Sequence, residues 1–279
     1  QLVPKDQLVK TNGWMQLLNS GSFLLGPVIG ASLYAIFPMS IVLMSDVAGA
    51  ILASIALAVV KIPKLEKAEC REQHFTAEIK EGLQVFKEDK KLFYIMIAEA
   101  LCMFFYAPLS SFYPLMTSDY FKLSAMYGSA VELSFAIGMM VSSLLFSSVL
   151  KINRKIRVSF IGLFAMGVMS LICGIIPPAY VGWFFFAGSC ICLGASGNVH
   201  TIPLTAYMQE TISPDRMGRA FSVLTLISSV TMPIGLLFSS PIAERVGVNV
   251  WFFISGLCMI MLTTGVLIRY AAKRRNLSV

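Results

Sequence analysis

The sequence predicts an all-α polytopic membrane protein that crosses the bilayer eight times. Of its 279 residues, 57% are hydrophobic and only 13% are charged, and the mean hydropathy is +0.76. A soluble domain carries about 25% charged residues, which it needs to cover its surface. Because this chain has too few polar side chains for that, lipid must replace water over much of its surface. Backbone groups in lipid have to be hydrogen-bonded within the protein, which favours helices.

Eight apolar stretches are long enough to be transmembrane helices. A bilayer core of about 30 Å requires roughly 20 residues of helix. Very short turns, such as Phe37-Pro38 and Pro177-Pro178, join neighbouring spans. The predicted spans cover residues 12–36, 38–60, 92–116, 124–150, 158–176, 178–208, 220–242 and 247–268.

The basic residues are distributed unevenly between the two sides of these spans. Of the 22 Lys and Arg residues, 20 lie at one set of span ends, and only Lys122 and Arg245 lie at the other. Cytoplasmic loops carry an excess of Lys and Arg, so the basic side is expected to be cytoplasmic, with both ends of the chain there. The net charge of +7 does not indicate nucleic-acid binding, because the basic residues sit between apolar runs rather than along one face.

The one long connection, residues 61–91, is strongly charged but contains an apolar pattern. Its apolar residues recur at helical spacing, which is typical of an amphipathic helix. Such a helix could lie on the inner surface of the membrane, or the segment could simply tether two helical bundles. The apolar positions are Phe75, Ile79, Leu83 and Phe86.

Small residues recur at close spacing along the first span. Small residues let helices approach closely, and a proline removes one backbone donor and bends a helix. The pattern predicts a kinked helix with a smooth face, suited to rocking against a partner or to ordinary close packing. A similar arrangement, a cytoplasmic proline followed by a Gly/Pro-broken span, recurs around 214–235 as a weak internal repeat. The residues of the first-span pattern are Gly13, Ser22, Gly26, Pro27, Gly30 and Ala31.

Several short segments, in order along the chain, resemble one family. The whole of residues 2–267 resembles macrolide efflux proteins in the drug:proton antiporter group of the major facilitator superfamily. The first-span pattern resembles the antiporter motif of the fifth helix of that group, with Ser22 and Ala31 replacing two glycines. The segments are 4–6, 26–27, 46–50, 61–64, 132–138, 214–219 and 247–249.

The resemblance implies a major facilitator-type helical bundle of twelve spans, of which these eight are the fifth to the twelfth. The sequence is then expected to be N-terminally truncated. Residues 1–60 would hold the last two helices of the N-terminal bundle, 61–91 the cytoplasmic inter-bundle loop, and 92–279 the C-terminal six-helix bundle.

The same resemblance implies a function in secondary active transport. We expect proton-coupled export of macrolide-like or other amphiphilic drugs across a bacterial plasma membrane, conferring antibiotic resistance, by a protein that needs no cofactor. The sequence leaves the oligomeric state open, and a monomer is favoured. Its partners would be the lipid bilayer, the small substrate and protons. Export of a natural product, such as a siderophore or a lipid, and a non-transporting role are the alternatives. An enzyme is not expected, because the two histidines, His74 and His200, cannot form a catalytic or metal-binding cluster.

Three acidic residues lie inside predicted spans. An ionisable group at mid-membrane costs roughly 2.5–3.5 kcal/mol, which makes it a functional candidate. At a rise of about 1.5 Å per residue, Asp46 and Glu132 lie about 12 Å from the outer face and Glu99 about 10 Å from the inner face. The resemblance implies that Glu99 faces the transport cavity, that Glu132 lies near it and that Asp46 supports it. All three are proton-coupling candidates, and a hydrogen-bonded helix contact is the alternative for each.

The remaining candidates would line the cavity or close its inner gate. Aromatic walls suit large, varied apolar ligands, and a histidine can titrate near neutral pH or be a hydrogen-bonded packing residue. The cavity candidates are Phe105, Tyr106, Tyr113 and His200. The gate candidates are Asp215, Arg216 and Arg219, which could equally form a solvated turn that signals topology.

Overall fold

The computed structural model describes residues 3–59, 75–148 and 152–275, and these parts contain helices and no strands. Eight of the described helices are long and apolar enough to cross a membrane, which confirms the predicted number of spans. The predicted span ends at residues 60 and 150 lie outside the described residues. The eight helices are α1 (Leu8–Ile36), α2 (Met39–Val59), α4 (Lys90–Leu115), α5 (Ala125–Ser148), α6 (Lys155–Ile175), α7 (Tyr180–Thr211), α8 (Pro214–Val246) and α9 (Val248–Arg275).

Several helices extend beyond the predicted apolar spans. α1 begins at Leu8 rather than residue 12, and α8 begins at Pro214 rather than residue 220. The extra turns carry charged residues, which a helix tolerates once it has left the hydrocarbon. Pro214 is suited to the first position of α8, because the first backbone N–H groups of a helix have no partner within it.

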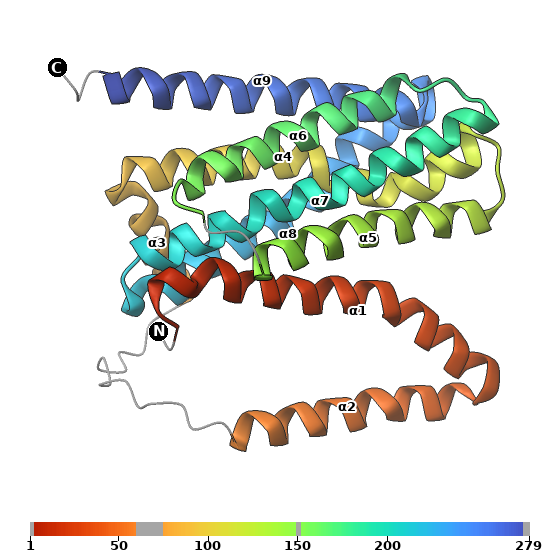
Figure 1. The fold of residues 1–279 in the computed structure, drawn as a ribbon, viewed down its shortest axis with the longest axis horizontal. Helices are drawn as coiled ribbons and strands as arrows, with labels where there is room; N and C mark the ends of the chain where they lie inside the picture. Colours follow the sequence, from red (N-terminus) through yellow and green to blue (C-terminus); the bar gives the residue numbers. More distant parts are fainter. Residues whose placement is uncertain (1–2, 60–74, 149–151, 276–279) are drawn as a thin grey trace.

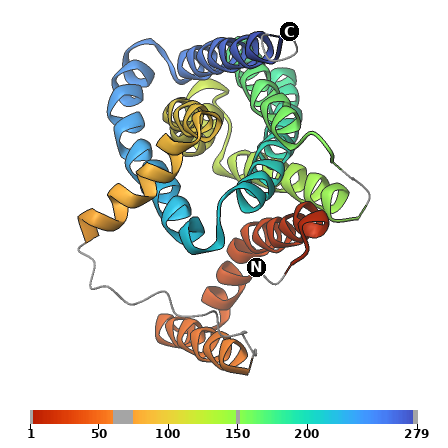
Figure 2. The same ribbon diagram turned by 90° about the vertical axis from the view of Figure 1, so that its left-hand side faces the viewer.

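The helices α4 to α9 form one bundle, and α1 lies along its side (Figure 1). α1 packs against α5 and α7, whereas α2 buries none of its residues and has its main contact with α1. The start of α1 and the end of α9 lie at the same end of the bundle as α3 (Figures 1 and 2). We call this the α3 end.

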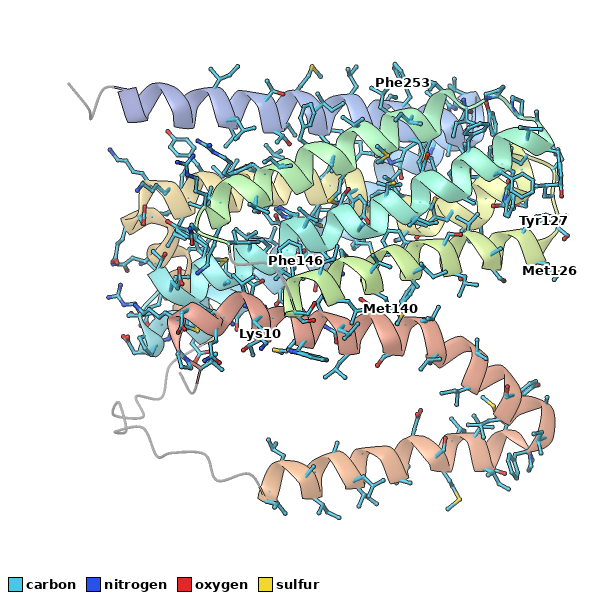
Figure 3. All side chains as sticks on the ribbon, in the orientation of Figure 1. Lys10, Met126, Tyr127, Met140, Phe146 and Phe253 are labelled. Carbon is cyan, nitrogen blue, oxygen red and sulfur yellow. The ribbon has the colours of Figure 1, made fainter. Side chains whose placement is uncertain are left out.

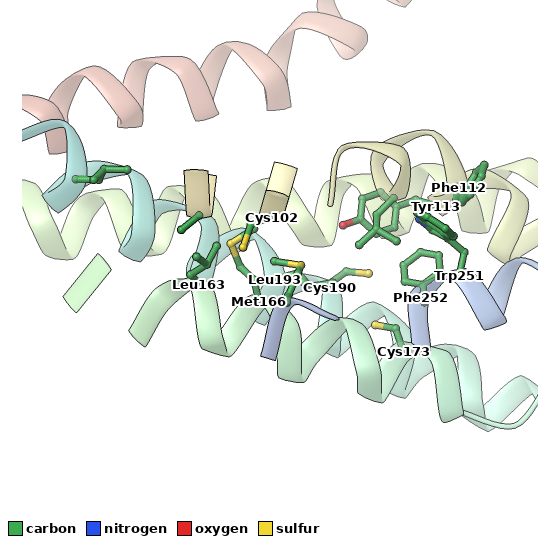
Figure 4. Packing of buried hydrophobic residues seen from close by; sticks show 14 of the residues in the cluster. Cys102, Phe112, Tyr113, Leu163, Met166, Cys173, Cys190, Leu193, Trp251 and Phe252 are labelled. Carbon is green, nitrogen blue, oxygen red and sulfur yellow. The ribbon is translucent and has the colours of Figure 1, made fainter. Parts of the chain in front are cut away.

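The core of the bundle combines an aromatic cluster with sulfur-containing and aliphatic side chains (Figure 4). The Tyr113 ring lies 5.7 Å from that of Phe135 and 5.8 Å from that of Phe252, measured between centroids. Cys102 and Cys190 are fully buried within the same cluster. This core joins α4, α5, α7 and α9.

Glycines allow the main helices to approach one another at backbone distance. A Cβ atom on Gly138 of α5 would overlap the Ile191 carbonyl oxygen of α7, and one on Gly194 would overlap the Phe135 carbonyl oxygen. Each helix therefore contributes one glycine to the α5–α7 contact, and each glycine lies against the backbone of the other helix. Their missing side chains are what brings these helices together.

The turn between α8 and α9 consists of Gly247 alone. Its φ of +114° lies in the left-handed region, which side chains disfavour and glycine adopts readily. The Gly247 N–H also donates to the Ala243 carbonyl oxygen at 3.1 Å, which ends α8. One residue therefore suffices to reverse the chain.

The apolar pattern in the long connection does form a helix, α3 (Phe75–Glu88). Phe86 is fully buried, and Ile79 and Leu83 are partly buried. α3 packs against α8 and α4, so protein covers part of its apolar stripe. The Phe75 side chain and the segment 60–74 lie outside the described residues.

We predict that Gly138→Ala destabilises the protein, because the added methyl group overlaps α7. Overpacking of this kind costs about 1–3 kcal/mol. Thermal unfolding of the purified protein in detergent measures the effect, which should appear as a lower Tm. Gly188→Ala is the matched control, because a Cβ there meets nothing within 4 Å. Equal Tm values for the two variants would contradict the account of the α5–α7 contact.

Candidate functional site

A buried chain of polar groups joins three helices inside the bundle. The His200 Nε2 atom on α7 lies 2.7 Å from Oε2 of Glu99 on α4. The other ring nitrogen, Nδ1, lies 2.8 Å from the hydroxyl oxygen of Ser159 on α6 and 3.1 Å from the Ser159 carbonyl oxygen. The side chains of His200 and Glu99 are 4% and 15% exposed. The structure therefore brings together two residues that the sequence suggested separately.

Close packing of α6 on α7 positions this chain. Gly162 lies one turn after Ser159 on α6, and a Cβ atom on it would approach the His200 backbone nitrogen to 2.5 Å. Residues three apart share one face of a helix. Because Gly162 lets that face of α6 approach the α7 backbone, the Ser159 hydroxyl can reach the His200 ring.

A second polar cluster joins α1 to the bundle. The Gln16 side-chain amide donates to Asn198 Oδ1 at 2.8 Å. Asn198 donates in turn to the Met139 carbonyl oxygen and to the Ser143 hydroxyl, both at 2.8 Å. Asn198 is 1% exposed, so these bonds satisfy a buried amide.

The same seam continues toward the α3 end. Asn12 donates to Gln209 Oε1 at 2.8 Å, and Lys5 donates to the Glu210 carbonyl oxygen at 3.4 Å. Lys155 forms an ion pair with the Glu210 side chain. The sequence analysis did not single out Asn12 or Gln16, although two amides four residues apart in an apolar span were a usable signal.

A small apolar cluster accompanies this seam. Phe146 of α5 is buried with Leu8 and Val9 of α1 and with Ile202 and Ala206 of α7 (Figure 3 labels Phe146 and, nearby on α1, Lys10). Apolar and polar contacts therefore hold the same half of α1 on α5 and α7.

The glycine pattern of the first span divides into two parts. Gly13 is buried, and a Cβ on it would approach the Ser147 backbone nitrogen of α5 to 2.8 Å. Ser22 is exposed, and a Cβ on Gly26 or Gly30 would meet nothing within 4 Å. The second half of α1 bends away from α5 (Figure 1). Pro27 and Ala31 lie on this half, and their side chains are outside the described set.

The other two membrane acids lie apart from the buried chain. Asp46 is exposed on α2 and Glu132 is exposed on α5. Within the described residues, neither acid has a hydrogen bond or an ion pair. Glu132 shares a face of α5 with Met139 and Ser143 by helical spacing. It therefore lies beyond the Asn198 cluster, on the side where α1 diverges.

The aromatic candidates pack against other side chains of the bundle core. Tyr113 is 5% exposed and fills the aromatic core. Phe105 stacks on Trp251 of α9, with centroids 6.2 Å apart, and Tyr106 is partly buried against the same core. Phe105 and Tyr113 thus make core contacts within the described residues, and a role for them in lining a cavity stays a prediction.

The candidate gate residues pair with α3. Arg216 lies 2.6 Å from Glu88, and Arg219 lies 2.5 Å from Glu81. Asp215 is exposed and, with Arg219, borders a groove of about 730 Å³ between α3 and α8. The arginines thus hold α3 to the start of α8, which the sequence could not indicate.

We predict that Asn198→Ala loosens α1. The substitution leaves buried partners on α1 and α5 without a bond, at a cost of about 1–3 kcal/mol. Thermal unfolding in detergent should show a lower Tm than for Asn153→Ala, which removes the same group from an exposed loop position. Identical unfolding of both variants would argue against a stabilising seam.

We predict that α3 is held by its apolar contact more than by its ion pairs. Phe86→Ala removes a fully buried ring and should cost about 3–5 kcal/mol. Arg216→Gln removes one exposed ion pair and should cost no more than about 1 kcal/mol. Hydrogen–deuterium exchange of the α3 backbone amides separates the two contributions. Faster exchange in Arg216→Gln than in Phe86→Ala would refute the ranking.

Known proteins of similar sequence are transporters. Residues 1–236 match the family described as Major Facilitator Superfamily. The chain is 37% identical over 260 residues to macrolide efflux protein A of Streptococcus pyogenes, covering 93% of this chain and 64% of that protein. It is 35% identical over 236 residues to macrolide efflux protein A of Enterococcus faecalis, covering 84% of this chain and 72% of that protein.

A more distant relative is the uncharacterised transporter YfiS of Bacillus subtilis, which is of the same superfamily type. It is 24% identical over 291 residues, covering 99% of this chain and 68% of that protein. No solved structure matches the chain. The family match and the two relatives above 30% identity together show that the chain belongs to the major facilitator superfamily.

Proposed function

We propose that the protein exports macrolide-like or other amphiphilic drugs across a bacterial plasma membrane, driven by the proton gradient. The observation that carries this proposal is the 37% identity, over 93% of this chain, to a protein named for macrolide efflux. The chain spans 64% of the length of that relative. The transport activity is therefore assigned to the complete gene product.

The helices divide into parts of two bundles in this proposal. Residues 92–279 form the C-terminal six-helix bundle, 61–91 the connection on the cytoplasmic side, and 1–60 the last two helices of the N-terminal bundle. The contacts support this division, because α2 has its main contact with α1, and α1 joins α4–α9 along one seam. The eight spans would then correspond to helices five to twelve of twelve.

Alternating access would use the two halves of α1 differently. At the α3 end, Gly13 lies against the α5 backbone and Gln16 is bonded to Asn198. At the other end α1 diverges from α5 (Figure 1). With the α3 end in the cytoplasm, this arrangement is closed inside and open outside. Rocking of α1 about its smooth contact would exchange the two states.

The charge distribution favours a neutral or cationic substrate. In the described spans every Lys and Arg lies near a helix end, whereas Glu99, Glu132 and Asp46 lie within the spans. An anionic substrate, such as a siderophore, would need a cation at membrane depth. A large apolar drug needs none.

We predict that cells producing the complete gene product accumulate less labelled macrolide than cells without it, and that an uncoupler abolishes the difference. Gly13→Ala should weaken efflux while leaving the amount of protein in the membrane unchanged, because it pushes α1 from α5. Gly21→Ala is the matched control, since a Cβ there meets nothing within 4 Å. Unchanged accumulation across a panel of macrolides would remove the substrate assignment.

A further inference from the structure

We propose that Glu99 and His200 together form the proton-binding site that couples this transporter to the proton gradient, with Ser159 positioning the ring. The inference rests on the proposed proton-driven export and names the groups that would carry it. Its basis is the buried contact of 2.7 Å between the carboxylate and the imidazole.

The surroundings of His200 offer hydrogen-bond partners to both ring nitrogens in both protonation states. In the proton-free pair, Nε2–H donates to the Glu99 carboxylate, and Nδ1 accepts from the Ser159 hydroxyl at 2.8 Å. In the proton-bound pair, one proton is added at Nδ1, and Nδ1–H donates to the Ser159 carbonyl oxygen at 3.1 Å. One residue thus supplies both a donor and an acceptor to the same ring nitrogen. Adding the proton changes the net charge of the pair from −1 to zero.

Few other groups act on this pair. Within the described residues, the ring interacts with Glu99 and with Ser159. Beside Glu99 on the same helix lies Cys102, which in turn lies beside Thr263 of α9. Lys155, one turn before Ser159 on α6, is engaged with Glu210 instead. The charge of the pair therefore depends mainly on its own proton.

The position of the pair links proton binding to helix movement. α4 packs chiefly against α8 and α9, whereas α7 packs chiefly against α5 and α6, and α9 also packs against α6. The Glu99–His200 contact links α4 directly to α7. A buried net charge is costly, so the proton-free pair favours an arrangement in which water reaches Glu99, and the proton-bound pair favours the buried contact. Proton occupancy would then shift the balance between two conformations.

The other membrane acids lack this construction. Glu132 and Asp46 are exposed, and the described residues give them no partner. Exposed carboxylates can attract a cation, but their protonation breaks no contact between the helices that the structure describes. The buried pair is the stronger candidate for coupling for this reason.

The test uses inside-out membrane vesicles and measures two activities separately: uptake driven by a proton gradient and exchange without one. Glu99→Gln and His200→Gln should lose uptake of labelled macrolide driven by a pH gradient, while exchange of macrolide without a gradient stays within about twofold of the parent. Glu244→Gln, the same change at an exposed glutamate near the end of α8, should alter neither. Parallel loss of uptake and exchange would show a merely structural role, and retained uptake in both variants would overturn the proposal.

A second measurement needs no substrate. The infrared difference spectrum of the purified protein between about pH 5 and about pH 9 brackets ordinary imidazole titration near 6.5. With His74 replaced by Gln in every sample, the spectrum should contain an imidazole band that is lost in His200→Gln and altered in Glu99→Gln. If the band is present but no macrolide is transported, the proposed substrate fails and the proton site stands. An unchanged spectrum in His200→Gln would refute the proton site even if macrolide export is confirmed.

Discussion

Helices in lipid gain little by burying apolar side chains against one another, because the lipid is apolar as well. Close backbone contact and satisfied polar groups must hold them together instead. In this protein, glycines supply the close contacts, as at Gly138 and Gly194 between α5 and α7 and at Gly162 between α6 and α7. The polar sites depend on these contacts, because a serine or an amide can reach its partner only when the two backbones are near.

α7 is the element on which the polar sites converge. Asn198 faces α5 and α1, and His200 faces α6 and α4. Two residues along a helix correspond to a rotation of about 200°, so these side chains point in nearly opposite directions from one helix. Movement of α7 would therefore disturb the docking of α1 and the Glu99–His200 pair together, which gives the proposed coupling a physical route.

The membership of the major facilitator superfamily rests on sequence similarity, and the geometry adds what similarity alone lacks. It assigns the glycine pattern of the first span two environments, one packed at Gly13 and one open at Gly26 and Gly30. It also gives Arg216 and Arg219 specific partners on α3. The connection between the proposed bundles is thus attached to α8 and not only to its neighbours in sequence.

The sequence by itself determined the helical class, the eight spans, the uneven distribution of basic residues and the amphipathic helix in the long connection. These features follow from composition and spacing within short segments, so no knowledge of neighbours is needed. Only the tertiary structure decided that Glu99 meets His200, that Gln16 meets Asn198, and that Tyr113 lies in the core. Such pairs lie 101 and 182 residues apart, and they form only when helices adopt one particular rotation and depth relative to one another. Hydropathy carries no information on either quantity.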